Sequence, residues 1–276
     1  MIVPILQYYA LGEGVTAFSS TRQGGCSEGR YGEFNINRYC GDSEEAIRQN
    51  RQALCGLLGI SDDRLLMPHQ VHLTQMAVID EPFLQCPTPD QQARLEGVDA
   101  LMTDMTGVCI GVSTADCIPV LLADTTHRAV CAVHAGWRGT VKRIVEKAVA
   151  KMTGTYGSRP ADIIVQIGPG ISLDSFEVGD EVYEAFAAEG FNMESISQRY
   201  PTKDNDGSKW HIDLPTCNRQ QLVAAGISPA NIAVSPVCTY KQSETFFSAR
   251  RLSINSGRIF TGIMITGWAQ HFNKTV

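Results

Sequence analysis

The sequence predicts a mixed α/β fold in a single domain, residues 1–276, and three observations support this prediction. Segments with helical spacing of apolar residues alternate along the chain with short apolar runs that are typical of strands. The composition, 43% apolar and 19% charged, is that of an ordinary globular protein. Two turn-rich stretches, residues 80–97 and 200–209, read as surface excursions, and neither separates two self-contained hydrophobic patterns.

Four helices are expected. The first runs to Leu58 from a capping residue, Asp42 or Ser43, and has two acidic residues in its first turn, where the helix dipole favours them. The second, residues 139–152, has apolar residues spaced three and four apart. Residues 178–189 and 215–225 are each followed by a glycine, the residue that most often ends a helix.

Seven strands are expected between and around these helices. Each is a short run rich in apolar residues and bounded by turn-forming residues. They cover residues 77–79, 108–113, 117–123, 128–134, 162–167, 232–235 and 259–265.

Charge and cysteine usage exclude several function classes. A net charge of −6 with dispersed Lys and Arg argues against duplex nucleic acid as a partner, because phosphate contacts need clustered basic residues. The apolar runs are too short for a membrane span, and no signal peptide is recognisable at the start. Nine cysteines without a CxxC pair favour reduced thiols and hence the cytoplasm. The net charge is still compatible with a small ligand that carries an anionic group, because one or two arginines can bind it.

The stretch TADCIPVLLADTTHRAVCAVHAGWRG predicts a β-hairpin, because two apolar strands flank a polar turn. If the turn is centred between Thr125 and Thr126, Cys117 lies directly opposite His134. Opposed side chains start from Cβ atoms roughly 4.5–5.5 Å apart. A thiolate and an imidazole at that separation can share a zinc ion.

A third ligand is expected from MPHQVHL, which offers His69 and His72. The residues alone leave the choice open, since side chains three apart share a face on a helical turn but not on a strand. Three protein ligands leave a coordination position for water or substrate, as in catalytic zinc sites. A structural zinc would need a fourth ligand, for which Cys109, Cys131 and Cys238 are available.

Several motifs together resemble the YfiH family, long labelled laccase-domain or polyphenol oxidase proteins and now described as purine nucleoside phosphorylases. The matching elements run nearly from end to end. They are SSTRQGG, FNINRYCGD, NR, HQVH, DALMTD, TADCIPVLL, AVHAGWRG, IGPGIS, FEVGDEV, CTY and FFSARR. One departure is Gly170, which stands where many relatives have the cysteine of an IGPC motif.

The resemblance implies a sandwich of mixed β-sheets flanked by helices, with zinc held by His72, Cys117 and His134. It also implies that Arg51, in the NR motif, helps catalysis together with Cys117 and His134. The implied reaction is phosphorolysis of purine nucleosides, such as adenosine, inosine, guanosine and methylthioadenosine, to the free base and ribose 1-phosphate. Adenosine deamination is an implied companion activity.

Phosphorolysis needs an anion site, and Arg138 is the expected phosphate ligand, because it lies near the start of the expected helix 139–152. Arg51 and Arg22 are further candidates. Asp116, next to Cys117, either orients an imidazole or stabilises a turn. The aromatics Trp137, Phe246 and Phe247 are more often core residues than base-stacking platforms.

Three other readings compete with the phosphorylase. A multi-copper oxidase needs about ten histidines, and the chain has six. A hydrolase would use Cys117 as nucleophile and His134 as base, with an amide of a cell-wall precursor as one suggested substrate. A non-enzymatic metal-binding module would close the zinc with a fourth ligand.

Overall fold

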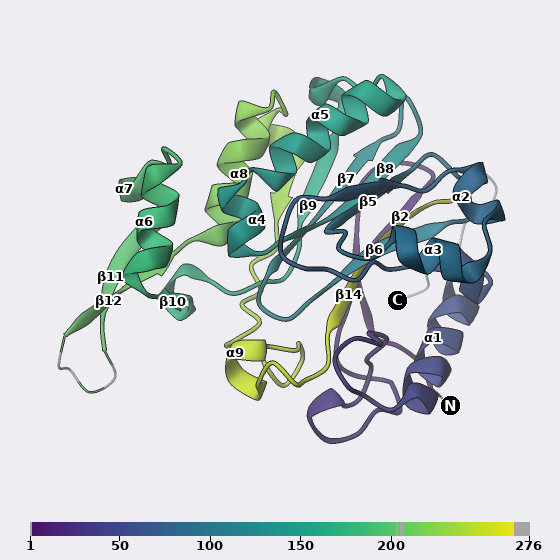
Figure 1. The fold of residues 1–276 in the computed structure, drawn as a ribbon, viewed down its shortest axis with the longest axis horizontal. Coiled ribbons are helices and arrows are strands. Elements are labelled where there is room, and N and C mark those ends of the chain that lie inside the picture. The colour runs from purple at the N-terminus through teal and green to yellow at the C-terminus, as the bar shows by residue number, and fades with distance from the viewer. Residues whose placement is uncertain (1, 203, 205–206, 268–276) are drawn as a thin grey trace.

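Two large β-sheets are stacked face to face at the centre of the protein (Figure 1). The computed structural model describes residues 2–202, 204 and 207–267. The first sheet has the strand order β13 (Ile232–Val234), β9 (Ile164–Ile167), β7 (Ile118–Asp124), β8 (Ala129–Ala135), β5 (Ala100–Thr103) and β4 (Met76–Val78). The second has the order β1 (Leu6–Tyr9), β2 (Val15–Ser20), β14 (Ile259–Ile265), β6 (Cys109–Thr114) and β3 (Leu65–Leu66).

A layer of apolar side chains fills the space between the two sheets. Val112 of β6, Leu121 of β7, Ala132 of β8 and Ile263 of β14 are completely buried in this layer. Burying apolar side chains stabilises the folded state by about 25 cal/mol for each Å² of apolar surface removed from water. The layer therefore fixes the relative position of β6 and β7, whose connection carries Cys117.

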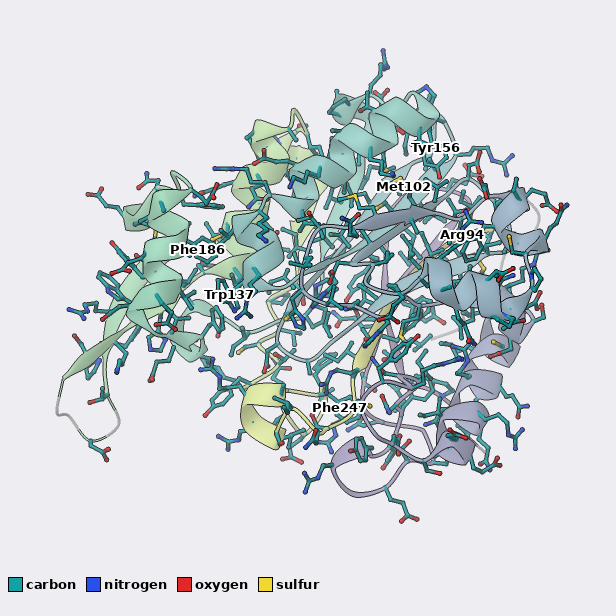
Figure 2. The ribbon with its side chains drawn as sticks, in the orientation of Figure 1. Arg94, Met102, Trp137, Tyr156, Phe186 and Phe247 are labelled. Atoms are coloured by element: carbon teal, nitrogen blue, oxygen red, sulfur yellow. The ribbon has the colours of Figure 1, made fainter. Side chains whose placement is uncertain are left out.

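Helices cover the outer faces of both sheets (Figure 1). The apolar side of α1 (Glu44–Leu58) packs on the five-stranded sheet, while α5 (Ile144–Tyr156) and α8 (Leu214–Ala224) cover the six-stranded sheet together with the short α4 (Trp137–Val141). In Figure 2, Met102 of β5 lies beneath Tyr156 of α5. The architecture is the predicted sandwich of mixed sheets flanked by helices.

A smaller unit projects from one side of the sandwich, on the left of Figure 1. It contains the sheet β10 (Glu177–Val178), β12 (Ser208–Ile212) and β11 (Ser197–Pro201), with α6 (Asp180–Ala188) and α7 (Met193–Ile196). Tyr183 of α6 stacks on Trp210 of β12 with ring centroids 4.1 Å apart. The 200–209 stretch is thus the tip of the β11–β12 hairpin, and residues 203, 205 and 206 lie outside the described ones.

The expected elements are confirmed with boundaries that shift by a few residues, except at two places. The expected helix 139–152 is two helices, α4 and α5, because Arg143 adopts the left-handed conformation with φ of 60°. The apolar spacing continues across this break, so the periodicity does not reveal it. Single-domain organisation stays a prediction.

The second correction concerns residues 80–97, which contain α2 (Glu81–Gln85) and α3 (Thr88–Arg94) and are not a plain loop. Pro82 and Pro89 lie in the first turns of these helices, where a missing backbone N–H costs nothing. These two prolines, which suggested a loop in the sequence, lie in the first turn of a helix.

None of the described helices has the length and hydropathy that crossing a membrane would require.

Candidate metal centre

Three potential metal ligands, His72, Cys117 and His134, meet at one point of the described chain. One ring nitrogen of each histidine and the Cys117 sulfur all lie within 4.8 Å of one another. The two imidazoles meet edge to face, with ring centroids 4.7 Å apart. The three side chains line a pocket with a volume of about 810 Å³, which reaches from the end of β6 to the segment after α9 (Ala249–Leu252).

The hairpin β7–β8 brings Cys117 and His134 together, but in a different register from the predicted one. Pro119, not Cys117, lies opposite His134, because the connection is a four-residue loop closed by the pair Asp124 and Ala129. Successive side chains alternate between the faces of a sheet, so a shift of two residues leaves Cys117 and His134 on the same face. They are diagonal neighbours at the end of the hairpin, within reach of one ion.

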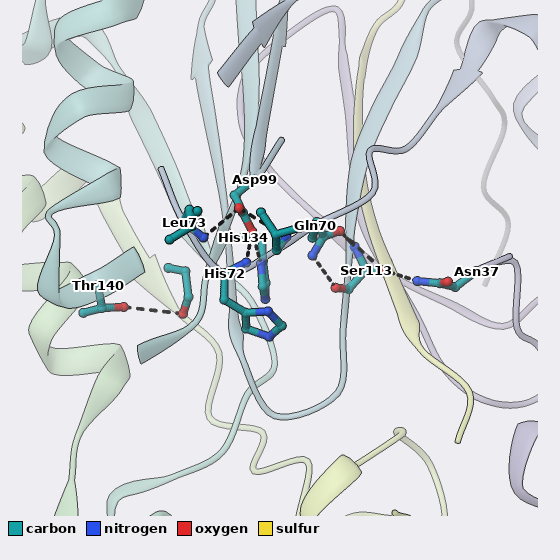
Figure 3. A network of polar contacts seen from close by, with 10 residues as sticks. Asn37, Gln70, His72, Leu73, Asp99, Ser113, His134 and Thr140 are labelled. Atoms are coloured by element: carbon teal, nitrogen blue, oxygen red, sulfur yellow. Dashed lines mark hydrogen bonds and ion pairs between the residues drawn. The ribbon is translucent and has the colours of Figure 1, made fainter. Parts of the chain in front are cut away.

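His72 comes from a loop before β4, and its backbone is held in an uncommon conformation. Its φ of 63° lies in the left-handed region, which costs a non-glycine residue roughly 1 kcal/mol or more. Such a conformation persists only where the surroundings impose it. Here the Asp99 carboxylate accepts the backbone N–H groups of His72 at 2.9 Å and of Leu73 at 2.8 Å (Figure 3).

The same carboxylate holds the ring of His134. The Asp99 Oδ1 to His134 Nδ1 distance is 2.8 Å, and both side chains are buried. Nδ1–H then donates a hydrogen bond to the carboxylate, which leaves Nε2 as the nitrogen that could bind a metal ion once it has lost its own proton. In Figure 3 Asp99 lies between Leu73, His72 and His134, so one side chain positions two of the three ligands.

The charges of the three groups are coupled. Burial opposes ionisation of the Cys117 thiol, but the charge of His134 and hydrogen bonds from both histidines outweigh it and lower its pKa to about 6. Burial also disfavours the His134 imidazolium, yet the Cys117 thiolate and Asp99 raise its pKa to about 9. The Cys117 thiol therefore ionises more easily near neutral pH than an ordinary thiol, and the thiolate is the form that binds metal.

A glycine keeps the space between the ligands open. A Cβ at Gly136 would lie 2.9 Å from His72 Cδ2, closer than real Cβ atoms come, and 3.2 Å from Cys117 Sγ, a tight contact. The donor set, one thiolate and two imidazoles around a space that only a glycine leaves free, suits a transition-metal ion. Among the described residues the cluster comprises three ligands, and no fourth from Cys109, Cys131 or Cys238 joins it.

The two arginines expected in the site do not line the pocket among the described residues. Arg51 is buried, and its guanidinium donates to the Asp62 carboxylate at 2.7 Å and to the Leu65 carbonyl at 2.9 Å. Arg138 is exposed and lies with its guanidinium 4.3 Å from the centroid of the neighbouring Trp137 ring. The Arg22 guanidinium donates to the carbonyls of Gly32 and Ser243.

Asp116 connects distant segments of the chain and does not orient an imidazole. Its two oxygens accept from the Thr239 hydroxyl and from the Arg250 backbone N–H, each at 2.7 Å. Its φ of 90° marks a second strained residue beside a ligand. His69 also has a partner outside the cluster, because its Nδ1 lies 2.6 Å from Glu96 Oε1.

The aromatic residues of the pocket differ from those considered in the sequence. Tyr39 and Phe176 line it, whereas Phe246 and Phe247 belong to a buried apolar cluster with Ile259. Trp137, labelled in Figure 2, is the first residue of α4 and packs against the core. Asp99 is the residue that the sequence analysis missed, and its signal was an acidic residue directly before the apolar strand of DALMTD.

With this geometry established, the sequence can be compared with known proteins. Residues 16–266 match the family model described as multi-copper polyphenol oxidoreductase laccase. The chain belongs to this family. The predicted resemblance to the laccase-domain, or YfiH, family is thereby confirmed.

Relatives in the family carry other activities in their names. A Bacteroides thetaiotaomicron protein named purine nucleoside phosphorylase is 46% identical over 251 residues, which are 91% of this chain and 92% of the relative. Adenosine deaminase RL5, from an unknown prokaryotic organism, is 47% identical over 253 residues, 91% of this chain and 94% of that protein. The crystal structure of YlmD from Geobacillus stearothermophilus has a TM-score of 0.84 at 30% identity and covers 96% of this chain and 100% of that one.

Proposed function

We propose that this protein is a zinc-dependent purine nucleoside phosphorylase, which converts a purine nucleoside and phosphate into the free base and ribose 1-phosphate. The observation that carries the proposal is the cluster of His72, Cys117 and His134 in a pocket of about 810 Å³, with three ligands and therefore an open coordination position. A pocket of this size accommodates a nucleoside. The names of the relatives supply the reaction class.

Zinc is the metal that we propose, and metal analysis of the purified protein distinguishes it from copper, which can bind the same two histidines and one cysteine. Blue-copper sites combine two histidines and a cysteine with a weak axial ligand, most often methionine. No methionine is among the described residues that line this pocket. When bound, zinc would supply positive charge for a phosphate oxygen, or lower the pKa of a water molecule toward neutrality.

The side chains of the pocket would bind and orient the nucleoside. The buried Thr114 lines the pocket, and its hydroxyl has no hydrogen-bond partner among the described residues. Gln70 is held in place by the backbone of Ser113, with its amide oxygen 2.7 Å from that N–H (Figure 3). The rings of Tyr39, which stacks on His69, and of Phe176 also line the pocket and would contact the purine.

Adenosine deamination is the second activity that we propose for the same site. The relative named adenosine deaminase RL5 is as similar to this chain as the phosphorylase from Bacteroides thetaiotaomicron is. Deamination would need water at the open metal position and no phosphate, so the two activities differ in their co-substrate.

All nine cysteines are free thiols, which supports a cytoplasmic location.

The competing hydrolase would use the same two residues. The lowered pKa of Cys117 and its contact with His134 are also features of a nucleophile and its base. Such an enzyme would act without metal and form a covalent intermediate on Cys117. A non-enzymatic metal-binding module would bind zinc without any turnover.

The first testable prediction is that turnover requires both phosphate and zinc. Inosine or adenosine with phosphate should give free base and ribose 1-phosphate in equal amounts, and base release should stop when phosphate is left out. Chelation should abolish the reaction and added zinc should restore it. Product analysis by chromatography, with mass spectrometry of Cys117 during turnover, checks these results. Equal base release without phosphate, or an adduct on Cys117 in metal-free active protein, contradicts the proposal.

A further inference from the structure

Two arginines that the proposed reaction has not used line the pocket of the metal centre. Arg250 belongs to the FFSARR motif and is the second residue of the short helix α9, and Arg258 lies directly before β14. Neither guanidinium forms an ion pair with a carboxylate among the described residues. Cationic groups without a counter-charge in a pocket favour an anionic ligand.

Arg258 is fixed in place by uncharged partners. Its Nη1 donates to the Ser256 carbonyl at 2.6 Å, and its Nη2 donates to the Ile254 carbonyl at 2.7 Å. Its backbone N–H also donates to the Asn35 side chain at 3.1 Å. The carbonyls order the guanidinium but do not cancel its charge. Because the side chain is already ordered, less conformational entropy is lost when an anion binds.

Arg250 is also held by an uncharged partner. Its Nη1 donates to the Glu177 carbonyl at 3.0 Å, and the guanidinium lies 5.6 Å from the centroid of the Phe176 ring. Asp116 is an acid that lines the pocket, and one of its oxygens accepts the Arg250 backbone N–H. The other oxygen accepts from the Thr239 hydroxyl, so the contacts of this carboxylate among the described residues include no ion pair with a guanidinium.

We propose that Arg250 and Arg258 bind the phosphate co-substrate, an inference that rests on the phosphorylase function proposed above. A phosphate between the two guanidinium groups would receive charge-assisted hydrogen bonds, which are stronger than neutral ones. The same pocket holds the proposed zinc ligands, so the anion and the nucleoside meet in one cavity. Arg51 and Arg138, the arginines suggested by the sequence, lie outside this lining.

The test compares Arg250→Gln and Arg258→Gln with Arg251→Gln. Arg251 is the matched control, because it is the next residue on α9, is exposed, stacks on Tyr240 and does not line the pocket. We expect the KM for phosphate to rise tenfold or more in the two pocket variants. The KM for inosine should change less than twofold, and the control should match the wild type.

A second readout keeps the test independent of turnover. Inorganic phosphate should raise the thermal midpoint of zinc-loaded wild type and of Arg251→Gln, and raise it much less in Arg250→Gln. Arg258 forms hydrogen bonds within its own loop, so Arg258→Gln could disturb the fold. Its result is used only if its circular dichroism spectrum and its thermal midpoint without phosphate match those of the wild type. If they do not match, Arg250→Gln alone decides the test.

The possible failures are distinguishable. A wild type that requires phosphate, together with an unchanged phosphate KM in Arg250→Gln, overturns the proposed anion site and leaves the phosphorylase function intact. A wild type that releases base without phosphate overturns the function itself and, with it, the role of these arginines. Unequal binding of phosphate by the wild type and Arg251→Gln would also count against the assignment.

Discussion

Cys117→Ala is expected to eliminate both zinc binding and phosphorolysis while leaving the fold intact. The substitution removes the thiolate and leaves two imidazoles, which cannot complete a three-ligand site. The loss of activity should exceed the 10–100-fold that is typical when a group supporting a ligand is removed. Metal analysis of the purified variant, together with product assays, measures both effects.

The matched control for this variant is Cys131→Ala, in the same hairpin. Cys131 is completely buried in the core between the six-stranded sheet and its helices, so its truncation should lower the thermal midpoint and spare the metal. The two cysteines should therefore separate stability from metal binding. Full zinc occupancy in Cys117→Ala would remove the proposed site.

Asp99→Asn is expected to weaken zinc binding about 10- to 100-fold. The wild-type carboxylate accepts hydrogen bonds from the His134 ring and from the backbone N–H groups of His72 and Leu73. An amide has only one oxygen, so its NH₂ group would face a donor that it cannot satisfy. Either the His134 ring or the loop that carries His72 must then move. Competition with a metal-sensitive dye measures the dissociation constant.

Asp124→Asn provides a close control for that experiment. Asp124 is also buried, lies 2.7 Å from the Nδ1 of His127 and accepts backbone N–H groups of Thr126 and His127, but at the far end of the hairpin. Its substitution should cost stability and leave the zinc dissociation constant unchanged. If both variants bind zinc like the wild type, Asp99 has no positioning role.

The local parts of the fold could be predicted from the sequence, and the non-local parts could not. Apolar periodicity identified the strands of the hairpin and its two ligands, because both are read from neighbouring residues. The hairpin register was predicted wrongly by two residues, since it depends on the loop that Asp124 and Ala129 close. The side chains stayed on one face only because the shift was an even number.

Contacts between distant segments explain what the sequence left open. The residues could not choose between His69 and His72, because the choice depends on Asp99, which lies 27 residues from His72. The sequence also could not indicate that Arg250 and Arg258 line the pocket. Arg250 reaches it through a hydrogen bond to Asp116 across 134 positions of the chain, which no periodicity records.

The division of the ligands between a hairpin and a distant loop determines when the site forms during folding. The β7–β8 hairpin closes over only a few residues, so we expect Cys117 and His134 to meet early and His72, which Asp99 holds next to β5, to join them later. A partly folded chain thus presents two ligands and holds metal weakly. Zinc should therefore leave the refolding rate unchanged and slow unfolding, which refolding with and without chelator would reveal. If zinc binds as proposed, it would join the protein late in folding and stabilise the completed fold.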